Sequence, residues 1–182
     1  MNFCPLILKQ KGFTLVELLV AVSVLLIISA VSIPSFNAYI LNQNLKQAQE
    51  QLKNGIRDAQ NRAITGIDAK NTLCTTQCFW AFRYAQAESV YRIGLTDGKD
   101  QANCTTLDKL ESISPKLNGG ALLSTGSGSG SGCVFFEVAN ADVTPINMES
   151  SRLIRLSVPG SSATKCVEIN VAGMVKENDL CN

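Results

Sequence analysis

Residues 13–34 read FTLVELLVAVSVLLIISAVSIP and form the most apolar stretch of the chain. The first 21 residues of this stretch contain one charged side chain, that of Glu17. As an α-helix they would extend about 31 Å, close to the thickness of the hydrocarbon core of a bilayer. The segment before them carries Lys9 and Lys11, and positive charges beside a spanning helix favour the cytoplasmic side. The stretch therefore predicts one membrane-competent helix after a short cytoplasmic leader.

Two features distinguish this stretch from an ordinary membrane anchor. Glu17 lies inside the apolar run, where an unpaired carboxylate costs about 2.5–3.5 kcal/mol on insertion scales. A Gly12–Phe13 junction also precedes the acid by a short distance. Together the residues KGFTLVELLVA (11–21) resemble the prepilin leader and first helix of type IV pilins and type II secretion pseudopilins. The resemblance covers residues 9–34 and implies cleavage between Gly12 and Phe13 by a prepilin peptidase, with N-methylation of Phe13.

Thr14 and Glu17 are the polar residues at the start of this helix, and they admit two interpretations. After cleavage, Phe13 would carry a cationic amine, and Glu17 lies four residues along on the same helix face. In a staggered filament, Glu17 of one subunit would neutralise the amine of the next, which assigns Thr14 and Glu17 to assembly. The alternative is a capping box within one chain, with Thr14 as the N-cap and Glu17 three residues later.

The composition argues against an enzyme. The chain contains no histidine, which excludes Ser-His-Asp and Cys-His catalysis and removes the commonest zinc ligand. Loss of Lys9 and Lys11, two of the 16 basic residues, would leave one more acidic than basic residue, so no basic field is available to attract nucleic acid. We expect no catalytic residue, no cofactor and no small-molecule substrate.

Six of the seven cysteines follow the apolar stretch. With the leader in the cytoplasm, these six face the periplasm or the exterior, where disulfides form. Their even number predicts a disulfide framework without fixing the pairing. Zinc would need paired Cys-x2-Cys motifs, whereas Cys74 and Cys78 are separated by three residues, so we expect no metal site. The disulfide candidates are Cys74, Cys78, Cys104, Cys133, Cys166 and Cys181.

The helix is expected to continue beyond the apolar stretch to about Thr65. Apolar residues recur at steps of three and four, which predicts one buried helical stripe. The stripe consists of Leu41, Leu45, Ala48, Leu52, Ile56, Ala59 and Ala63. The polar residues Asn42, Lys46, Gln49, Lys53, Arg57 and Gln60 are expected on the opposite side. Pro34 lacks an amide hydrogen and should kink the helix, while Gly66 is expected to end it.

Apolar alternation after this helix predicts antiparallel strands. Expected strands span residues 79–84, 90–95, 134–138, 153–158, 167–171 and 174–176. The first two would form a pair whose aromatic faces make sheet core rather than a carbohydrate site. Residues 67–78 are expected to be irregular, 96–120 a loop with one short helical turn, and 125–132 (TGSGSGSG) an exposed loop. The last two strands would form a hairpin around Ala172-Gly173, flanked by Cys166 and Cys181, which makes these cysteines the favoured disulfide pair.

A second resemblance is carried by LKNGIRDAQNRAITG (52–66) and KCVEINVAGMVKENDLC (165–181). Together with the strands between them, these segments resemble H-type minor pseudopilins and FimT/FimU minor pilins. Some members of that family bind DNA through basic residues beside the hairpin glycine. Here Lys176 follows Gly173 but is itself followed by Glu177 and Asp179, and one lysine among acids is a poor phosphate clamp. We therefore do not expect nucleic acid as a partner.

The sequence as a whole predicts an α+β, pilin-like fold, in which a long kinked helix packs on an antiparallel β headgroup. The expected parts are a leader (1–12), a transmembrane or filament-core helix (13–34), its amphipathic continuation (35–66) and a disulfide-stapled headgroup (67–182). The expected function is a structural subunit, a minor pilin or pseudopilin of a type IV pilus or type II secretion pseudopilus.

Its expected partners are the prepilin peptidase, other pilin-like subunits and the inner membrane. The chain would cross that membrane once, with its C-terminal domain in the periplasm or the exterior, before it joins the filament. The alternative is a surface-exposed minor pilin that binds DNA or another ligand in uptake or adhesion.

Overall fold

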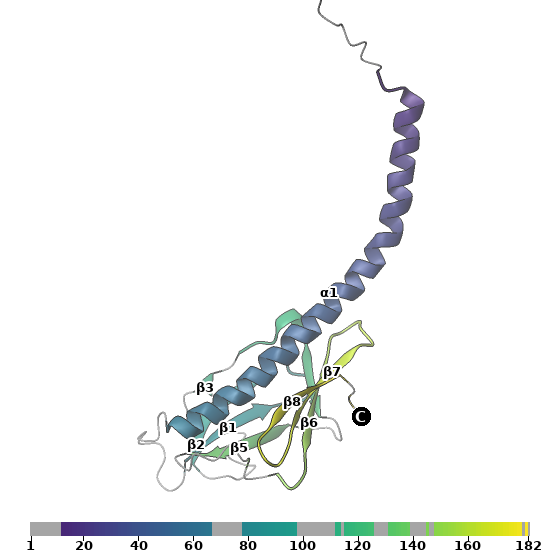
Figure 1. The fold of residues 1–182 in the computed structure, drawn as a ribbon. Coiled ribbons are helices and arrows are strands. Elements are labelled where there is room, and N and C mark those ends of the chain that lie inside the picture. Colours follow the sequence, from purple (N-terminus) through teal and green to yellow (C-terminus); the bar gives the residue numbers. More distant parts are fainter. Residues whose placement is uncertain are drawn as a thin grey trace, which may run out of the picture. The chain divides into compact units, whose positions relative to one another are not determined.

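The structure, a computed structural model, describes residues 12–66, 78–97, 112–113, 115–125, 131–138, 145, 148–179 and 181, without the side chains at 31–35, 112, 113 and 125. Helix α1 spans Leu15–Thr65. The strands are β1 (Cys78–Tyr84), β2 (Arg92–Asp97), β3 (Ser112–Ile113), β4 (Leu122–Thr125), β5 (Gly132–Glu137), β6 (Arg152–Ser157), β7 (Thr164–Ile169) and β8 (Val175–Asn178) (Figure 1). A 3₁₀ helix, η2 (Asn118–Gly120), precedes β4. This order is the α+β, pilin-like arrangement that the sequence predicted.

The chain divides into Met1–Tyr39, called the N-terminal unit below, and Ile40–Asn182, called the C-terminal unit. Helix α1 contributes to both units. Its backbone is helical at Pro34, whose side chain lies outside the description, so the kink at this position stays a prediction. Gly66 follows the last helical residue with a φ of 63°, the left-handed conformation that commonly ends a helix.

The strands form two antiparallel four-stranded sheets in the C-terminal unit. Their orders are β3-β2-β1-β5 and β4-β6-β7-β8. The two predicted pairs are present, β1 with β2 and β7 with β8. The turn between β7 and β8 is closed by the Gly173 amide, which donates to the Asn170 carbonyl at 3.0 Å, and Gly173 has a φ of 78° that favours glycine.

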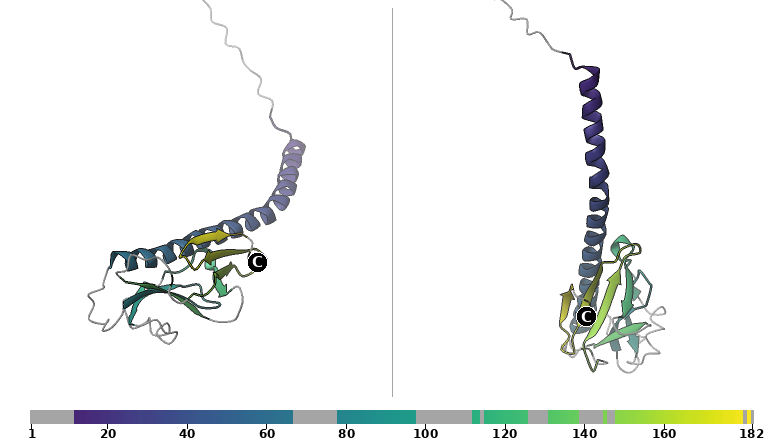
Figure 2. Two further views of the ribbon diagram at one scale, coloured as in Figure 1. Left: turned by 60° about the horizontal axis from the view of Figure 1, so that its bottom comes forward. Right: turned by 90° about the vertical axis from the view of Figure 1, so that its right-hand side faces the viewer.

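The C-terminal part of α1 lies along these sheets (Figure 2). The predicted stripe faces them: six of its seven residues, Leu45, Ala48, Leu52, Ile56, Ala59 and Ala63, have 0% exposure, and Leu41 is partly buried against the same core. Strands of both sheets complete this core, with Trp80 and Phe82 from β1 and Ile154 and Leu156 from β6. The aromatic faces predicted for β1 and β2 therefore belong to the core.

The prediction that Gln49 and Gln60 face away from the core is wrong. Both side chains are buried, with 1% and 7% exposure. Gln49 Nε2 donates to the Cys166 carbonyl at 2.7 Å, and Gln60 Nε2 donates to the Gly173 carbonyl at the same distance. The two amides lie at the flank of the apolar stripe, where they meet backbone carbonyls of the β7–β8 hairpin and so join that hairpin to the helix.

Substituting leucine for Gln60 is expected to lower the free energy of unfolding of the C-terminal unit by about 1–3 kcal/mol, because the buried Gly173 carbonyl loses a hydrogen bond. Urea unfolding of the mature chain in mild detergent, followed by tryptophan fluorescence, would measure the change. Gln47→Leu is the matched control, since Gln47 is exposed on the same helix, and it should change stability by no more than about 0.5 kcal/mol. Equal effects of the two substitutions would contradict this role for Gln60.

Several strand boundaries differ from the sequence prediction. Cys78 already belongs to β1, and residues 96 and 97 extend β2, although both places were predicted to be irregular. Strands β3 and β4 were not predicted, whereas the short helical turn expected within 96–120 corresponds to η2. Of the predicted exposed loop at 125–132, residues 126–130 lie outside the described residues.

Candidate processing and assembly site

Helix α1 begins with a hydrogen-bonded cap. Residues 12–14 precede the first helical residue, Leu15, and are exposed. The Thr14 carbonyl accepts from the Leu18 amide at 3.2 Å, and the Thr14 hydroxyl oxygen accepts from the Glu17 amide at 3.2 Å. Thr14 is therefore the N-cap of the helix, which is the threonine half of the predicted capping box.

Gly12 has no function in the fold that would require glycine. Its backbone is not among those with a positive φ, so an L-residue would meet no backbone strain there. A Cβ atom added at this position would meet no atom of the described residues within 4 Å. A requirement for glycine at position 12 would therefore have to come from a molecule that acts on the chain.

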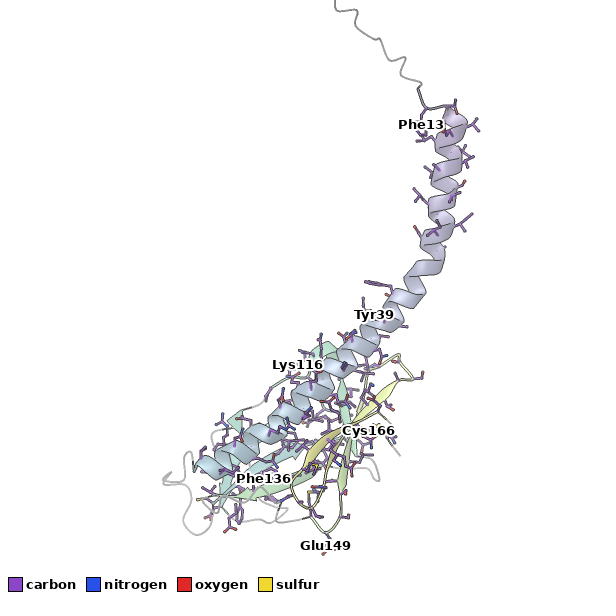
Figure 3. All side chains as sticks on the ribbon, in the orientation of Figure 1. Phe13, Tyr39, Lys116, Phe136, Glu149 and Cys166 are labelled. Atoms are coloured by element: carbon purple, nitrogen blue, oxygen red, sulfur yellow. A yellow bond between two sulfur atoms is a disulfide. The ribbon has the colours of Figure 1, made fainter. Side chains whose placement is uncertain are left out.

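Apolar side chains surround the first turns of α1 on every side. All side chains from Phe13 to Ala30 are exposed (Figure 3), and Phe13 and Leu15 are 77% and 79% exposed. Two serines interrupt this surface, but the Ser23 hydroxyl donates to the Val20 carbonyl and the Ser29 hydroxyl to the Leu25 carbonyl, both at 2.8 Å. The serine hydroxyls thus need no partner outside the helix, and the segment is suited to burial in apolar surroundings.

Glu17 differs from these serines. Its side chain is exposed, and no ion pair is found for its carboxylate among the residues that the structure describes. Its position within the first turn places a negative charge where the helix dipole favours it. Glu17 is therefore the acidic group of the apolar segment, exposed and without an ion pair among the described residues.

Residues 7–33 match the family model described as the prokaryotic N-terminal methylation motif. The chain carries the prepilin-type signal of type IV pilins and pseudopilins. Gly12, Phe13, Thr14 and Glu17 all lie within the match, which supports a pilin- or pseudopilin-like subunit. The signal implies processing by a prepilin peptidase and assembly with other such subunits. No curated protein and no solved structure matches the chain.

The signal suggests a membrane-anchored precursor. Within the residues that the structure describes, no helix is long and apolar enough to cross a membrane.

The cysteines that the structure describes are all disulfide-bonded and lie in the C-terminal unit. Cys166 and Cys181, the favoured pair, are bonded to each other with their Cα atoms 5.5 Å apart. Cys78 and Cys133 are also disulfide-bonded, whereas Cys74 and Cys104 lie outside the described residues. Among the described residues, no cluster of cysteine and acidic side chains could hold a metal ion.

The basic side chains near the last strands are largely engaged within the chain. Arg152 donates to the Cys133 carbonyl at 2.7 Å, and Arg155 donates to the Cys181 carbonyl at 2.9 Å. Lys165 pairs with Asp179 at 2.6 Å, and Lys53 of α1 pairs with Glu177. These contacts spread the positive charges over separate carbonyl and carboxylate partners, and counterion release from a phosphate backbone needs several cations on one surface.

A shallow groove of about 470 Å³ runs along the C-terminal part of α1. Glu50, Gln51 and Asp58 line it from the helix, and Tyr91 and Asn118 line it from the opposite side. The Tyr91 hydroxyl donates to the Gln51 carbonyl at 3.3 Å, and burial, with the nearby Asp58 carboxylate, raises the pKa of Tyr91. The groove therefore offers amides, carboxylates and a phenol.

Proposed function

We propose that this chain is a minor pilin or pseudopilin, a structural subunit of a type IV pilus or of a type II secretion pseudopilus. The prepilin peptidase cleaves the leader, residues 1–12, from Phe13 and methylates the new amino terminus. The observation that carries the proposal is that a glycine without a function in the fold stands in an exposed, non-helical segment of the prepilin-type signal.

The proposal places residues 13–34 in the inner membrane before assembly, with residues 35–66 as the amphipathic continuation and residues 67–182 as the headgroup in the periplasm or the exterior. The apolar composition of 13–33 and the internally bonded serine hydroxyls support this placement. Burial of such side chains contributes about 1.5–3 kcal/mol each, so the exposed apolar surface of this helix favours a lipid or helical environment.

In the filament, the same helix packs against helices of other pilin-like subunits. Glu17 then pairs with the Phe13 amine of a neighbouring subunit, and Thr14 holds the helix terminus at which the two charges meet. The resemblance of 52–66 and 165–181 to H-type minor pseudopilins favours a minor subunit. Sheared filaments in which this chain made up most of the mass would contradict the minor assignment.

Replacing Gly12 with valine is expected to abolish processing without affecting the fold, because a Cβ atom at this position meets no atom of the described residues within 4 Å. Mass spectrometry of the amino terminus would show the full precursor for the variant and methylated Phe13 for the wild type. Ala21→Val, which adds similar bulk on the exposed surface of helix α1, is the matched control and should be processed normally. A wild-type chain that retains residues 1–12 would refute the proposal.

The alternative function, an exposed pilin that binds DNA or another ligand, has less support. The contacts of Arg152, Arg155 and Lys165 within the chain leave few cations for phosphates. Binding to duplex DNA at physiological salt is then expected to be non-specific, with a Kd of about 10⁻⁴ M or weaker.

A further inference from the structure

We propose that Thr14 is a positioning residue for cleavage: its hydroxyl fixes the start of helix α1 and so keeps the Gly12–Phe13 peptide bond outside the helix. This inference rests on the proposed function, in which that bond is the one that the peptidase cleaves. It adds a role for a residue that is neither at the cleaved bond nor in the charge pair.

The geometry at the helix start carries the inference. The first helical residue, Leu15, is the third residue after the cleaved bond. The Glu17 amide donates to the Thr14 hydroxyl oxygen and the Leu18 amide to the Thr14 carbonyl, both at 3.2 Å. Thr14 thus occupies one of the amides that would otherwise be free at the helix terminus, and a residue in the N-cap position has a non-helical backbone.

Without a cap, Gly12 is the residue at this boundary that opposes extension of the helix, at a cost of about 1 kcal/mol. Lys9, Gln10 and Lys11 precede the cleaved bond, and lysine and glutamine are good helix formers. A helix that extended through Phe13 towards Lys11 would draw the cleaved bond into regular hydrogen bonding. Its carbonyl would then point along the helix axis, where a peptidase would have to unwind the chain before attack.

The side-chain chemistry allows the cap to be separated from direct reading of the hydroxyl. Serine caps through a hydroxyl, asparagine caps through an amide oxygen, and valine has the shape of threonine but cannot cap. A role in positioning requires that Thr14→Ser and Thr14→Asn both preserve cleavage. Direct recognition of the hydroxyl by the peptidase requires that only serine does so.

The test compares the full-length precursor and its three Thr14 variants in membranes that contain a prepilin peptidase. Initial cleavage rates should be close to wild type for Thr14→Ser and Thr14→Asn and about fivefold lower for Thr14→Val, the factor that corresponds to a typical N-cap. Hydrogen exchange of the Glu17 amide in the same precursors, in detergent and without peptidase, should show lost protection only in Thr14→Val.

Each other outcome overturns the inference. Wild-type cleavage of Thr14→Val would remove any need for the cap, and slow cleavage of both Thr14→Asn and Thr14→Val would assign the effect to the hydroxyl itself. Loss of Glu17 amide protection without a change in rate would show that the helix boundary does not govern cleavage. A wild-type precursor that is not cut between Gly12 and Phe13 would instead refute the proposed function. That result is read from the amino terminus of the wild-type chain and does not depend on the variants.

Discussion

Replacing both Cys166 and Cys181 with alanine is expected to lower the free energy of unfolding of the C-terminal unit by about 3 kcal/mol. The two cysteines are 15 residues apart, and closing a loop of about that length removes roughly this much conformational entropy from the unfolded chain. Total stabilities of small domains are about 5–15 kcal/mol. The Cys166–Cys181 disulfide would therefore provide a large share of the total.

Trp80 makes this loss measurable, because it is the one tryptophan of the chain. It is 1% exposed, and the Arg62 guanidinium lies over its ring at 5.1 Å, so its fluorescence should report unfolding of the C-terminal unit. Urea titration of the mature chain in mild detergent would give the change in free energy. Val171→Ala, an exposed substitution in the β7–β8 turn, is the control and should stay within about 0.5 kcal/mol. An unchanged midpoint for the double variant would contradict the expectation.

The helix could be predicted in detail because its determinants are local. Apolar residues at steps of three and four identified the stripe from Leu45 to Ala63, and these residues are buried. Gly66 could be assigned as the end of the helix for the same reason, because glycine readily adopts the positive φ that commonly ends a helix. The N-cap at Thr14 likewise depends on residues within one turn.

The error at Gln49 and Gln60 has a physical cause. The carbonyls that accept from these amides, those of Cys166 and Gly173, are 117 and 113 residues away in the sequence. Periodicity distinguishes apolar from polar positions, and it cannot show that a polar side chain at the flank of a stripe meets a distant backbone carbonyl. The spacing of 11 residues between the two glutamines, about three helical turns, was the available sign that both lie on the same flank.

Strand pairing could be predicted for neighbours in the sequence and was not predicted for distant partners. The β7–β8 hairpin was predicted because a glycine turn joins its strands directly. The pairing of β4 with β6 brings Leu123 opposite Leu156, and that of β1 with β5 brings Trp80 opposite Phe136. Neither of these two pairings leaves a local signal in the sequence, and β4 is too short to be recognised by its own pattern.

The candidate site, by contrast, could be predicted as a set because Gly12, Phe13, Thr14 and Glu17 belong to one continuous motif.

Replacing Glu17 with alanine is expected to reduce incorporation of the mature chain into filaments by about a hundredfold or more. The carboxylate is exposed in the isolated chain, and in the proposed assembly it meets the Phe13 amine of a neighbour inside packed apolar helices. Removing one partner of a buried charge pair costs about 3–5 kcal/mol, because the other charge is left without compensation. Insertion of the precursor in the membrane should not suffer, since alanine removes a charge from the apolar segment.

Two further variants separate the charge of Glu17 from its size and from polarity in general. Glu17→Gln keeps the shape without the charge and should fail as Glu17→Ala does. Ser23→Ala removes a hydroxyl that is already bonded to the Val20 carbonyl at 2.8 Å, so this variant should assemble like the wild type. Cleavage between Gly12 and Phe13 is checked first in every variant, so that each assembly measurement concerns the mature chain. Quantifying each chain in sheared filaments against the membrane fraction gives incorporation, and wild-type incorporation of processed Glu17→Ala would rule out the pairing of Glu17 with the Phe13 amine.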